Sequence, residues 1–267
     1  MNIAPTLAVI GGTGVYDPAM LTEISDVVVA TPYGEVSCQT GLLAGRMVAF
    51  IPRHGRHHSI PPHLINYRAN IWALKKLGVR KILATTAVGS LNVAMKPGDL
   101  VVPDQLLDFT KSRVSTFYEG GARGVVHVDM TTPYCNSLRQ TVIAAAAQRN
   151  LPVHNGACYV STEGPRFETA AEIKAYAMLG GDLVGMTGVP EAVLAREAEI
   201  CYVSVSMVTN FAAGISPTPL THAEVVDTMK QNAANIRALL HQTIVTAVPA
   251  EDCACQHALR EFGGFRL

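Results

Sequence analysis

The chain has 267 residues, and its 21 Lys and Arg balance its 21 Asp and Glu. A net charge of zero disfavours non-specific binding to nucleic acids or anionic membranes, because both need basic patches. Hydrophobic residues make up 49% of the sequence, which is enough for one large core and also indicates buried subunit interfaces. No apolar run approaches the ~20 residues of a membrane span, and Met1–Pro5 lacks the charged start of a signal peptide, so we expect a cytoplasmic protein.

Apolar strand-like runs alternate with helical patterns along the whole chain, with no linker or repeat between them. Strands are predicted at residues 7–10, 47–51, 81–86, 157–161, 183–186 and 202–209, and helices at 67–77, 169–179, 190–198 and 221–245. Fully apolar strands between amphipathic helices are typical of a sheet that is covered on both faces. The sequence therefore predicts one α/β domain over residues 1–267, with a mixed central sheet flanked by helices and a C-terminal tail from about residue 247.

Polar and glycine-rich segments follow five of the predicted strands. They are Gly12-Thr-Gly14, Arg53-His54, Thr85-Thr-Ala87, Thr187 and Thr209-Asn210. Ligands bind beyond the carboxyl ends of the strands in such sheets, so we expect these segments to converge on one site. The small hydroxyls, with one Arg and one His, favour an anion, since an Arg fork pairs well with phosphate.

The segment Gly11-Gly-Thr-Gly14 follows the first strand but does not fit the dinucleotide fingerprint. Asp17 stands where the third glycine belongs, which excludes a nucleotide-dependent oxidoreductase. No Lys-Ser or Lys-Thr pair follows, so the segment is not a phosphate-binding P-loop either. What remains is a tight turn whose N–H groups and Thr13 hydroxyl can hold a small anion.

Two sets of potential metal ligands lack the further ligands that a metal site needs. The histidines of residues 53–58 lie in a loop with no carboxylate nearby, and Cys253-Ala-Cys255 has no second cysteine pair in the sequence. A zinc site usually needs four closely spaced ligands, so we expect no metal. The two C-terminal cysteines are interpreted as inert, as a local disulfide or as a redox pair.

The segment Glu163–Thr169 separates a strand from a helix. Thr169 and Glu172 have the spacing of a capping box, which makes Thr169 structural. Phe167 and Glu168 are better candidates for binding, because an aromatic face beside a carboxylate suits a flat heterocycle that carries an N–H. Met186 adds an adaptable apolar surface to the same site.

Seven motifs together resemble the trimer-forming purine nucleoside phosphorylase and methylthioadenosine phosphorylase family. In chain order they are Gly11–Gly14, Arg53–Gly55, Asn66–Asn70, Thr85–Ser90, Lys96–Asp99, Glu163–Thr169 and Gly185–Glu191. The similarity runs from about residue 10 to 235, and the residues of the motifs are closer to those of the methylthioadenosine branch.

The resemblance implies that the N-glycosidic bond of a purine nucleoside is cleaved by inorganic phosphate, a co-substrate, with no metal or organic cofactor. It assigns phosphate binding to Thr13, Arg53, His54, Thr86, Ala87 and Thr187. It assigns the base and the ribose to Phe167, Glu168, Met186, Asn210, Phe211, Ala212, His222 and, from a neighbouring subunit, His127. Asn210, at N7 of the leaving purine, and His54, at the phosphate, are the catalytic candidates. The family forms trimers or dimers of trimers.

Four residues, in three segments of the chain, depart from the methylthioadenosine branch and predict the substrate. Asn210 and Ala212 stand where the adenine-cleaving enzymes carry two aspartates, and Glu168 stands where they carry a small residue. A carboxylate accepts the N1–H of a 6-oxopurine, whereas adenine offers only a lone pair there. His222 matches the histidine that binds the 5′-hydroxyl in ordinary purine nucleoside phosphorylases. We therefore expect a 6-oxopurine nucleoside phosphorylase that acts on inosine and guanosine in purine salvage.

Other interpretations stay open at this point. The base pocket also suits 5′-methylthioinosine, and the branch similarity keeps 5′-methylthioadenosine as a further alternative. From another class, a non-catalytic purine sensor would bind hypoxanthine without cleaving a nucleoside. The sequence assigns no role to residues 110–123, and it predicts a loop over the site at 213–220.

Overall fold

The computed structural model describes residues 4–11, 21–216, 222–248 and 252–267, with the side chains of 222–224 outside this description. The strands are β1 (Leu7–Gly11), β2 (Thr22–Thr31), β3 (Gly34–Leu43), β4 (Arg46–Pro52), β5 (Lys81–Ser90), β6 (Leu100–Val102), β7 (Gln105–Phe109), β8 (Val153–Asn155), β9 (Cys158–Thr162), β10 (Leu183–Gly185) and β11 (Cys201–Phe211). The helices are α1 (Tyr67–Lys76), α2 (Asn136–Gln148), α3 (Ala170–Met178), α4 (Gly188–Glu197) and α5 (His222–Thr246). Short 3-10 turns are η2 (Pro62–Leu64), η3 (Gly121–Arg123), η4 (Ala254–His257) and η5 (Arg260–Phe262).

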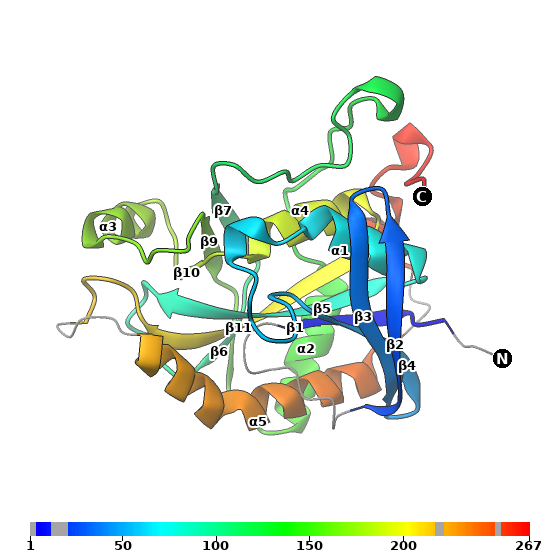
Figure 1. The fold of residues 1–267 in the computed structure, drawn as a ribbon. Helices are drawn as coiled ribbons and strands as arrows, with labels where there is room; N and C mark the ends of the chain where they lie inside the picture. Colours follow the sequence, from blue (N-terminus) through cyan, green and yellow to red (C-terminus); the bar gives the residue numbers. More distant parts are fainter. Residues whose placement is uncertain (1–3, 12–20, 217–221, 249–251) are drawn as a thin grey trace.

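Strand β5 is the hub of a single mixed sheet (Figure 1). It pairs in parallel with β1 and β11, and its last residues, Gly89 and Ser90, pair antiparallel with β10. From β1 the sheet continues through β4, β3 and β2, and from β10 through β9 and β7. Strand β11 leads on to β6 and β8. The expected mixed sheet is confirmed.

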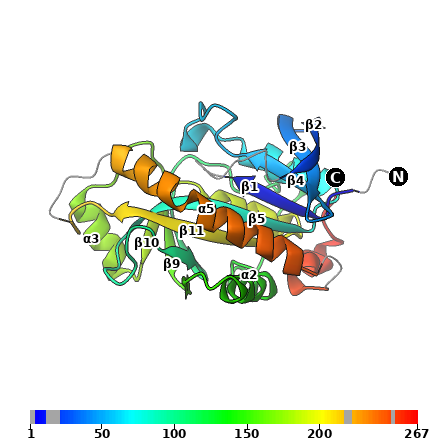
Figure 2. The ribbon, with the colours of Figure 1, turned by 90° about the horizontal axis from the view of Figure 1, so that it is seen from below.

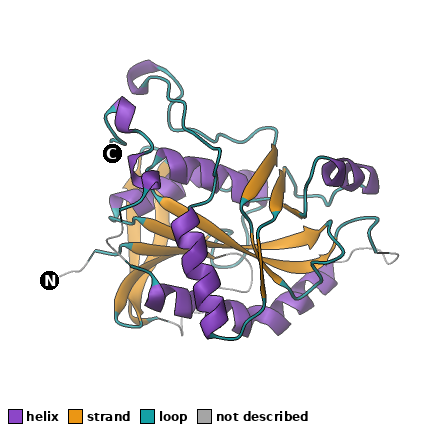
Figure 3. Ribbon diagram, turned by 180° about the vertical axis from the view of Figure 1, so that it is seen from behind, coloured by secondary structure: helices purple, strands orange, loops and turns teal. Residues whose placement is uncertain are grey.

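Helices cover both faces of the sheet, as Figures 2 and 3 show from two further sides. In β1, Leu7 and Val9 pack into the core under α2 and α5, whereas Ala8 and Ile10 pack into the core under α1 and α4. Successive side chains of a strand point to opposite faces, so a strand between two helix layers is buried throughout. This burial explains why β1 is apolar at consecutive positions and not only at alternate ones.

Two strands run further than the sequence predicts. Strand β5 continues past Thr86 to Ser90 because Gly89 and Ser90 pair with β10, and β11 continues past Thr209 to Phe211, which pairs with Ser90. The segments 85–87 and 209–210 therefore lie inside strands, so their predicted position at strand ends was wrong. The segments 85–87 and 209–210 reach the site because the neighbouring strands β1 and β4 already end at Gly11 and Pro52, beside Ala84 of β5.

Two long segments, 110–135 and 252–267, pack in part against the α1 and α4 side, where Phe117, Tyr134 and Phe265 join the core. Residues 110–135 leave β7, rise to η3 and return to α2, and they form the arm at the top of Figure 1. The C-terminal segment 252–267 is held by Glu199, whose carboxylate oxygens accept the backbone N–H groups of Leu259 and Phe265, each at 3.0 Å. Within the described residues, no helix is long and apolar enough to span a membrane.

Candidate active site

A cavity of about 400 Å³ opens where β1 and β4 end and β5 and β11 continue. The predicted site residues that line it are Arg53, His54, Thr86, Ala87, Phe167, Glu168, Met186, Thr187, Asn210 and Ala212. They come from β5 and β11 and from the segments that directly follow β4, β9, β10 and β11. Segments that lie far apart in the sequence therefore meet at one place, as the strand-end pattern predicted.

Two predicted residues of the described chain, Phe211 and His127, do not line this cavity. Phe211 lies between Asn210 and Ala212, which both line it, so the strand alternation turns the Phe211 side chain away. His127 is exposed on the arm and is not part of the cavity of its own chain. Thr13 and the side chain of His222 lie outside the described residues, and their predicted roles stay predictions.

Arg53 is almost fully buried, at 2% exposure, and Glu191 of α4 holds its guanidinium. Nε and Nη2 donate to the two Glu191 oxygens at 2.5 and 2.8 Å, and Nη1 donates to the carbonyl of Thr85 at 2.7 Å. Burial alone would lower the Arg53 pKa, but the Glu191 carboxylate raises it above its ordinary value. One N–H on each terminal nitrogen makes no bond to a described residue and is available to an anion.

His54 is neutral near pH 7. Burial is the main cause that lowers the pKa of His54 to about 4, and the neighbouring charges of Arg53 and His58 act in the same direction. Its Nδ1 lies 2.9 Å from the carbonyl of Ile60, which fixes the tautomer with the proton on Nδ1. The other ring nitrogen therefore carries a lone pair, so His54 accepts a hydrogen bond or a proton from the anion and does not act as a second cation.

The cavity wall also contains the buried Thr86 hydroxyl and the N-terminus of α4. The Thr86 hydroxyl lies 2.9 Å from that of Ser206 and 3.3 Å from that of Ser204. Thr187 immediately precedes α4, whose N-terminus carries a partial positive charge that favours an anion. The hydroxyl of Tyr159 accepts the N–H of Thr187 at 3.4 Å and fixes this turn.

Glu168 and Asn210 are two further polar side chains of the cavity wall that are held in fixed positions. Thr162 donates to one oxygen of Glu168 at 2.7 Å, and no described residue bonds the other oxygen. The Oδ1 of Asn210 accepts from the Thr209 hydroxyl at 2.7 Å, and its Nδ2 donates to the carbonyl of Phe211 at 2.8 Å. One carboxylate oxygen and one amide N–H therefore remain for a ligand.

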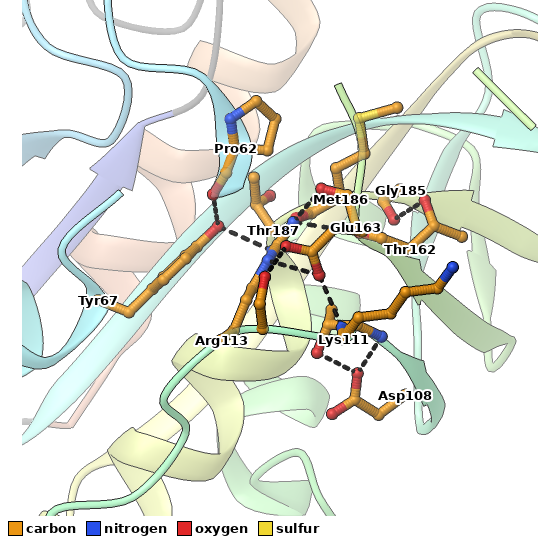
Figure 4. Close-up of polar contacts among 12 residues, drawn as sticks. Pro62, Tyr67, Asp108, Lys111, Arg113, Thr162, Glu163, Gly185, Met186 and Thr187 are labelled. Atoms are coloured by element: carbon orange, nitrogen blue, oxygen red, sulfur yellow. Dashed lines mark hydrogen bonds and ion pairs between the residues drawn. The ribbon is translucent and has the colours of Figure 1, made fainter. Parts of the chain in front are cut away.

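Arg113 of the arm joins the backbone at the end of β9 to the backbone that follows β10 (Figure 4). Its guanidinium donates to the carbonyls of Met186, Thr162 and Glu163 and, at 3.1 Å, to the Tyr67 hydroxyl. Only 2% of the Arg113 side chain is exposed. The arm, to which the sequence assigned no role, therefore positions the segments that carry Glu168 and Thr187.

Sequence reasoning missed three residues that position the site, namely Glu191, Arg113 and Thr162. A charged residue within the otherwise apolar start of α4 was the one available signal for Glu191, which is fully buried. Arg113 gave no signal, because most of its partners are backbone carbonyls that any sequence supplies. The capping box at Thr169 and Glu172 is confirmed.

The model of the phosphorylase superfamily matches residues 6–245, which is most of the chain. The chain therefore belongs to the phosphorylase superfamily, a group of pentosyltransferases in which phosphate is a substrate. The family resemblance of the sequence motifs is thereby confirmed, together with the fold class.

Individual relatives narrow the comparison. The chain is 53% identical over 262 residues to the 6-oxopurine nucleoside phosphorylase of Pyrococcus furiosus, covering 96% of this chain and 98% of that protein. It is 50% identical over 256 residues to a probable S-methyl-5′-thioinosine phosphorylase of Methanothermobacter thermautotrophicus, covering 95% and 89%. A crystal structure of a methylthioadenosine phosphorylase from an antarctic soil metagenomic library superposes with a TM-score of 0.90 at 39% identity, covering 97% and 92%.

Proposed function

We propose that this chain is a 6-oxopurine nucleoside phosphorylase, which converts inosine or guanosine and phosphate to the free base and ribose 1-phosphate. The observation that carries the proposal is the fixed Glu168 carboxylate in the same cavity as the Asn210 amide. A 6-oxopurine has a proton on N1 that the free Glu168 oxygen accepts. Adenine has a lone pair at N1, so its binding leaves two buried acceptors facing each other without a proton.

The reaction follows from two sets of groups in the cavity, Arg53 with Thr187 for phosphate and Glu168 with Asn210 for the base. Phosphate binds at Arg53 and the N-terminus of α4, with the predicted Thr13 completing the site. As the bond to C1′ stretches, positive charge develops on the sugar and negative charge on the purine. The phosphate anion stabilises the sugar cation and then attacks it, while the free N–H of Asn210 stabilises the purine at N7. A donor placed where charge develops contributes ~3–4 kcal/mol.

The test is phosphate-dependent cleavage of inosine, guanosine, adenosine, methylthioadenosine and methylthioinosine, measured side by side. We expect the wild type to cleave the 6-oxo nucleosides and to leave both adenine nucleosides uncleaved. Glu168→Gln should lower kcat/KM for inosine by at least ~100-fold and narrow the gap to adenosine, because an amide also donates to N1. Preferred cleavage of the adenine nucleosides by the wild type would refute the proposal.

Glu172→Gln is the matched control for this substitution. Glu172 lies in the same segment, but it caps α3 and pairs with Arg166 and does not line the 400 Å³ cavity. It should lower stability without changing the ratio of inosine to adenosine cleavage. An equal change of that ratio in both variants would show that Glu168 does not contact the base.

A second candidate substrate is S-methyl-5′-thioinosine, which shares the base pocket. It is favoured by Val225, an apolar residue of the cavity wall that lies three positions after His222 in α5. If His222 binds a 5′-hydroxyl, His222→Met should impair inosine cleavage and favour the methylthio substrate. If S-methyl-5′-thioinosine is the natural substrate, His222→Met should leave the turnover of inosine almost unaltered.

We also propose that the chain forms trimers or dimers of trimers in the cytoplasm and that each site takes His127 from a neighbour. His127 is exposed on the arm, and Val125 beside it is an exposed apolar residue, at 63%. Sedimentation velocity gives the oligomeric state. Mixed oligomers of a Glu168→Gln variant and a His127→Ala variant should recover activity that neither has alone, whereas a His127 that acts within its own chain would give no recovery.

A further inference from the structure

Four of the six cysteines meet at one point, although three separate parts of the chain supply them. The cysteine cluster consists of Cys135, Cys201, Cys253 and Cys255. Its four sulfur atoms all lie within 4.8 Å of one another, and none is joined in a disulfide. The C-terminal pair therefore lies beside two further cysteines, from distant parts of the chain, that the spacing of cysteines in the sequence does not reveal.

Local structure explains how these cysteines converge. Cys135 is the N-cap of α2, and Cys201 is the first residue of β11 in the core of the sheet. Cys253 is extended and Cys255 lies in the 3-10 turn η4, so the bend between them turns both side chains to the same point. Three of the four residues are buried and Cys253 is half-buried, which leaves the cluster just below the surface.

The spacing of the sulfur atoms fits a tetrahedral metal centre. A zinc ion bonds thiolate sulfur at ~2.3 Å, so the sulfur atoms of a four-thiolate site lie about 3.8 Å apart. The sulfur atoms of Cys135 and Cys253 are 3.5 Å apart, and every other pair lies within 4.8 Å. All four sulfur atoms therefore lie within 4.8 Å of one another, and none of them is bonded to another as a disulfide.

The surroundings suit thiolates as well. The backbone N–H of Leu138 donates to the sulfur of Cys135 at 3.5 Å, within the first turn of α2. The amide of Gln256 donates to the sulfur of Cys201 at 3.9 Å. N–H groups aimed at sulfur, and the positive end of a helix, stabilise the negative charge of a metal-bound thiolate.

We propose that the cysteine cluster binds one zinc ion as a structural four-thiolate site. Binding replaces four thiol protons, which pass to solvent, by one divalent cation, and four protein ligands leave no open position for a substrate. The ion ties the C-terminal segment from residue 252 to α2 and β11, on the side of the sheet core that contains α5. The site is separate from the cavity, because none of its residues lines that cavity.

The test is the metal content of the full-length protein, purified under reducing conditions from cells supplied with zinc. We expect one zinc per chain in the wild type and none in the Cys253→Ser/Cys255→Ser double variant. Cys158→Ser is the matched control, since Cys158 is a half-buried free thiol of β9 outside the cluster, and it should retain the metal. Loss of zinc to a chelator should lower Tm in the wild type but not in the double variant.

A second measurement covers the case in which the double variant does not fold. Cobalt added to the metal-free wild type should give the visible absorption bands of tetrahedral thiolate coordination, and four thiols should be blocked from a thiol reagent until a chelator is added. Wild-type protein without metal and with six reactive thiols overturns the proposal. Disulfides between cluster cysteines, found by mass spectrometry of non-reduced peptides, also overturn it, as does zinc that the folded double variant retains.

Discussion

Replacing Glu191 by Gln tests whether the buried ion pair positions Arg53 for phosphate. Both side chains are almost fully buried, at 1% and 0% exposure, so solvent screens their attraction very little. Removing one partner of a buried pair costs about 3–5 kcal/mol because the other charge stays behind uncompensated. Gln retains one hydrogen bond to the guanidinium, which places the expected loss near 3 kcal/mol. At 2–4 °C per kcal/mol, the Tm should fall by roughly 6–12 °C.

The same change should loosen the guanidinium and weaken phosphate binding. We expect the KM for phosphate to rise about tenfold, which corresponds to ~1.4 kcal/mol, with little change in the KM for the nucleoside. Glu197→Gln is the control, because Glu197 lies in the same helix and is buried, yet it bonds Thr116 and Phe117, away from the cavity. It should lower the Tm and leave the KM for phosphate unchanged. If Glu191→Gln behaves like this control, Glu191 does not position Arg53.

Two further predictions concern His54 and Arg113. The unfolded chain takes up a proton at His54 near pH 6.5 and the folded chain only near pH 4, so stability should fall as pH drops through this window. The free energy of unfolding in urea should fall less between pH 6.5 and pH 4 for His54→Gln than for the wild type. An equal fall in both proteins would contradict a neutral His54 in the folded chain. Arg113→Met should leave the carbonyls of Met186 and Glu163 unpaired and raise the KM for the nucleoside about tenfold. The control is Arg123→Met at the tip of the arm, which removes only a contact over the Trp72 ring and should leave this KM unchanged.

The central strands could be predicted because burial on both faces leaves an apolar run in the sequence. β1 and β11 are buried along almost their whole length, and both were found. The hairpin of β2 and β3 was missed because most of β2 is exposed, and its first half, Thr22–Asp26, mixes polar and apolar residues and has no long apolar run. Strand lengths were misjudged where pairing with β10 extended β5, since the sequence does not contain that long-range contact.

The cavity residues whose own chemistry suits a ligand were easier to predict than the residues that position them. Arg53 and Glu168 have side chains whose chemistry suits an anion and a base N–H, and both line the cavity. Glu191 acts on Arg53 from 138 positions away, and Cys135 meets Cys253 from 118 positions away. The spacing of residues within a motif cannot reveal pairs that lie so far apart in the sequence. The positioning residues and the cysteine cluster are therefore found only in the folded chain.

The charge balance of the cavity limits how phosphate can be held. Arg53 is the one permanent cation among the described residues that line it, and Glu191 already neutralises that charge. His54 is neutral and Glu168 is acidic, so binding rests on oriented N–H groups and the N-terminus of α4 rather than on net positive charge. Such dipoles act strongly in a buried site, where little water screens them. They also leave the bound phosphate its negative charge, which the reaction needs because the anion must stabilise and then attack a sugar cation.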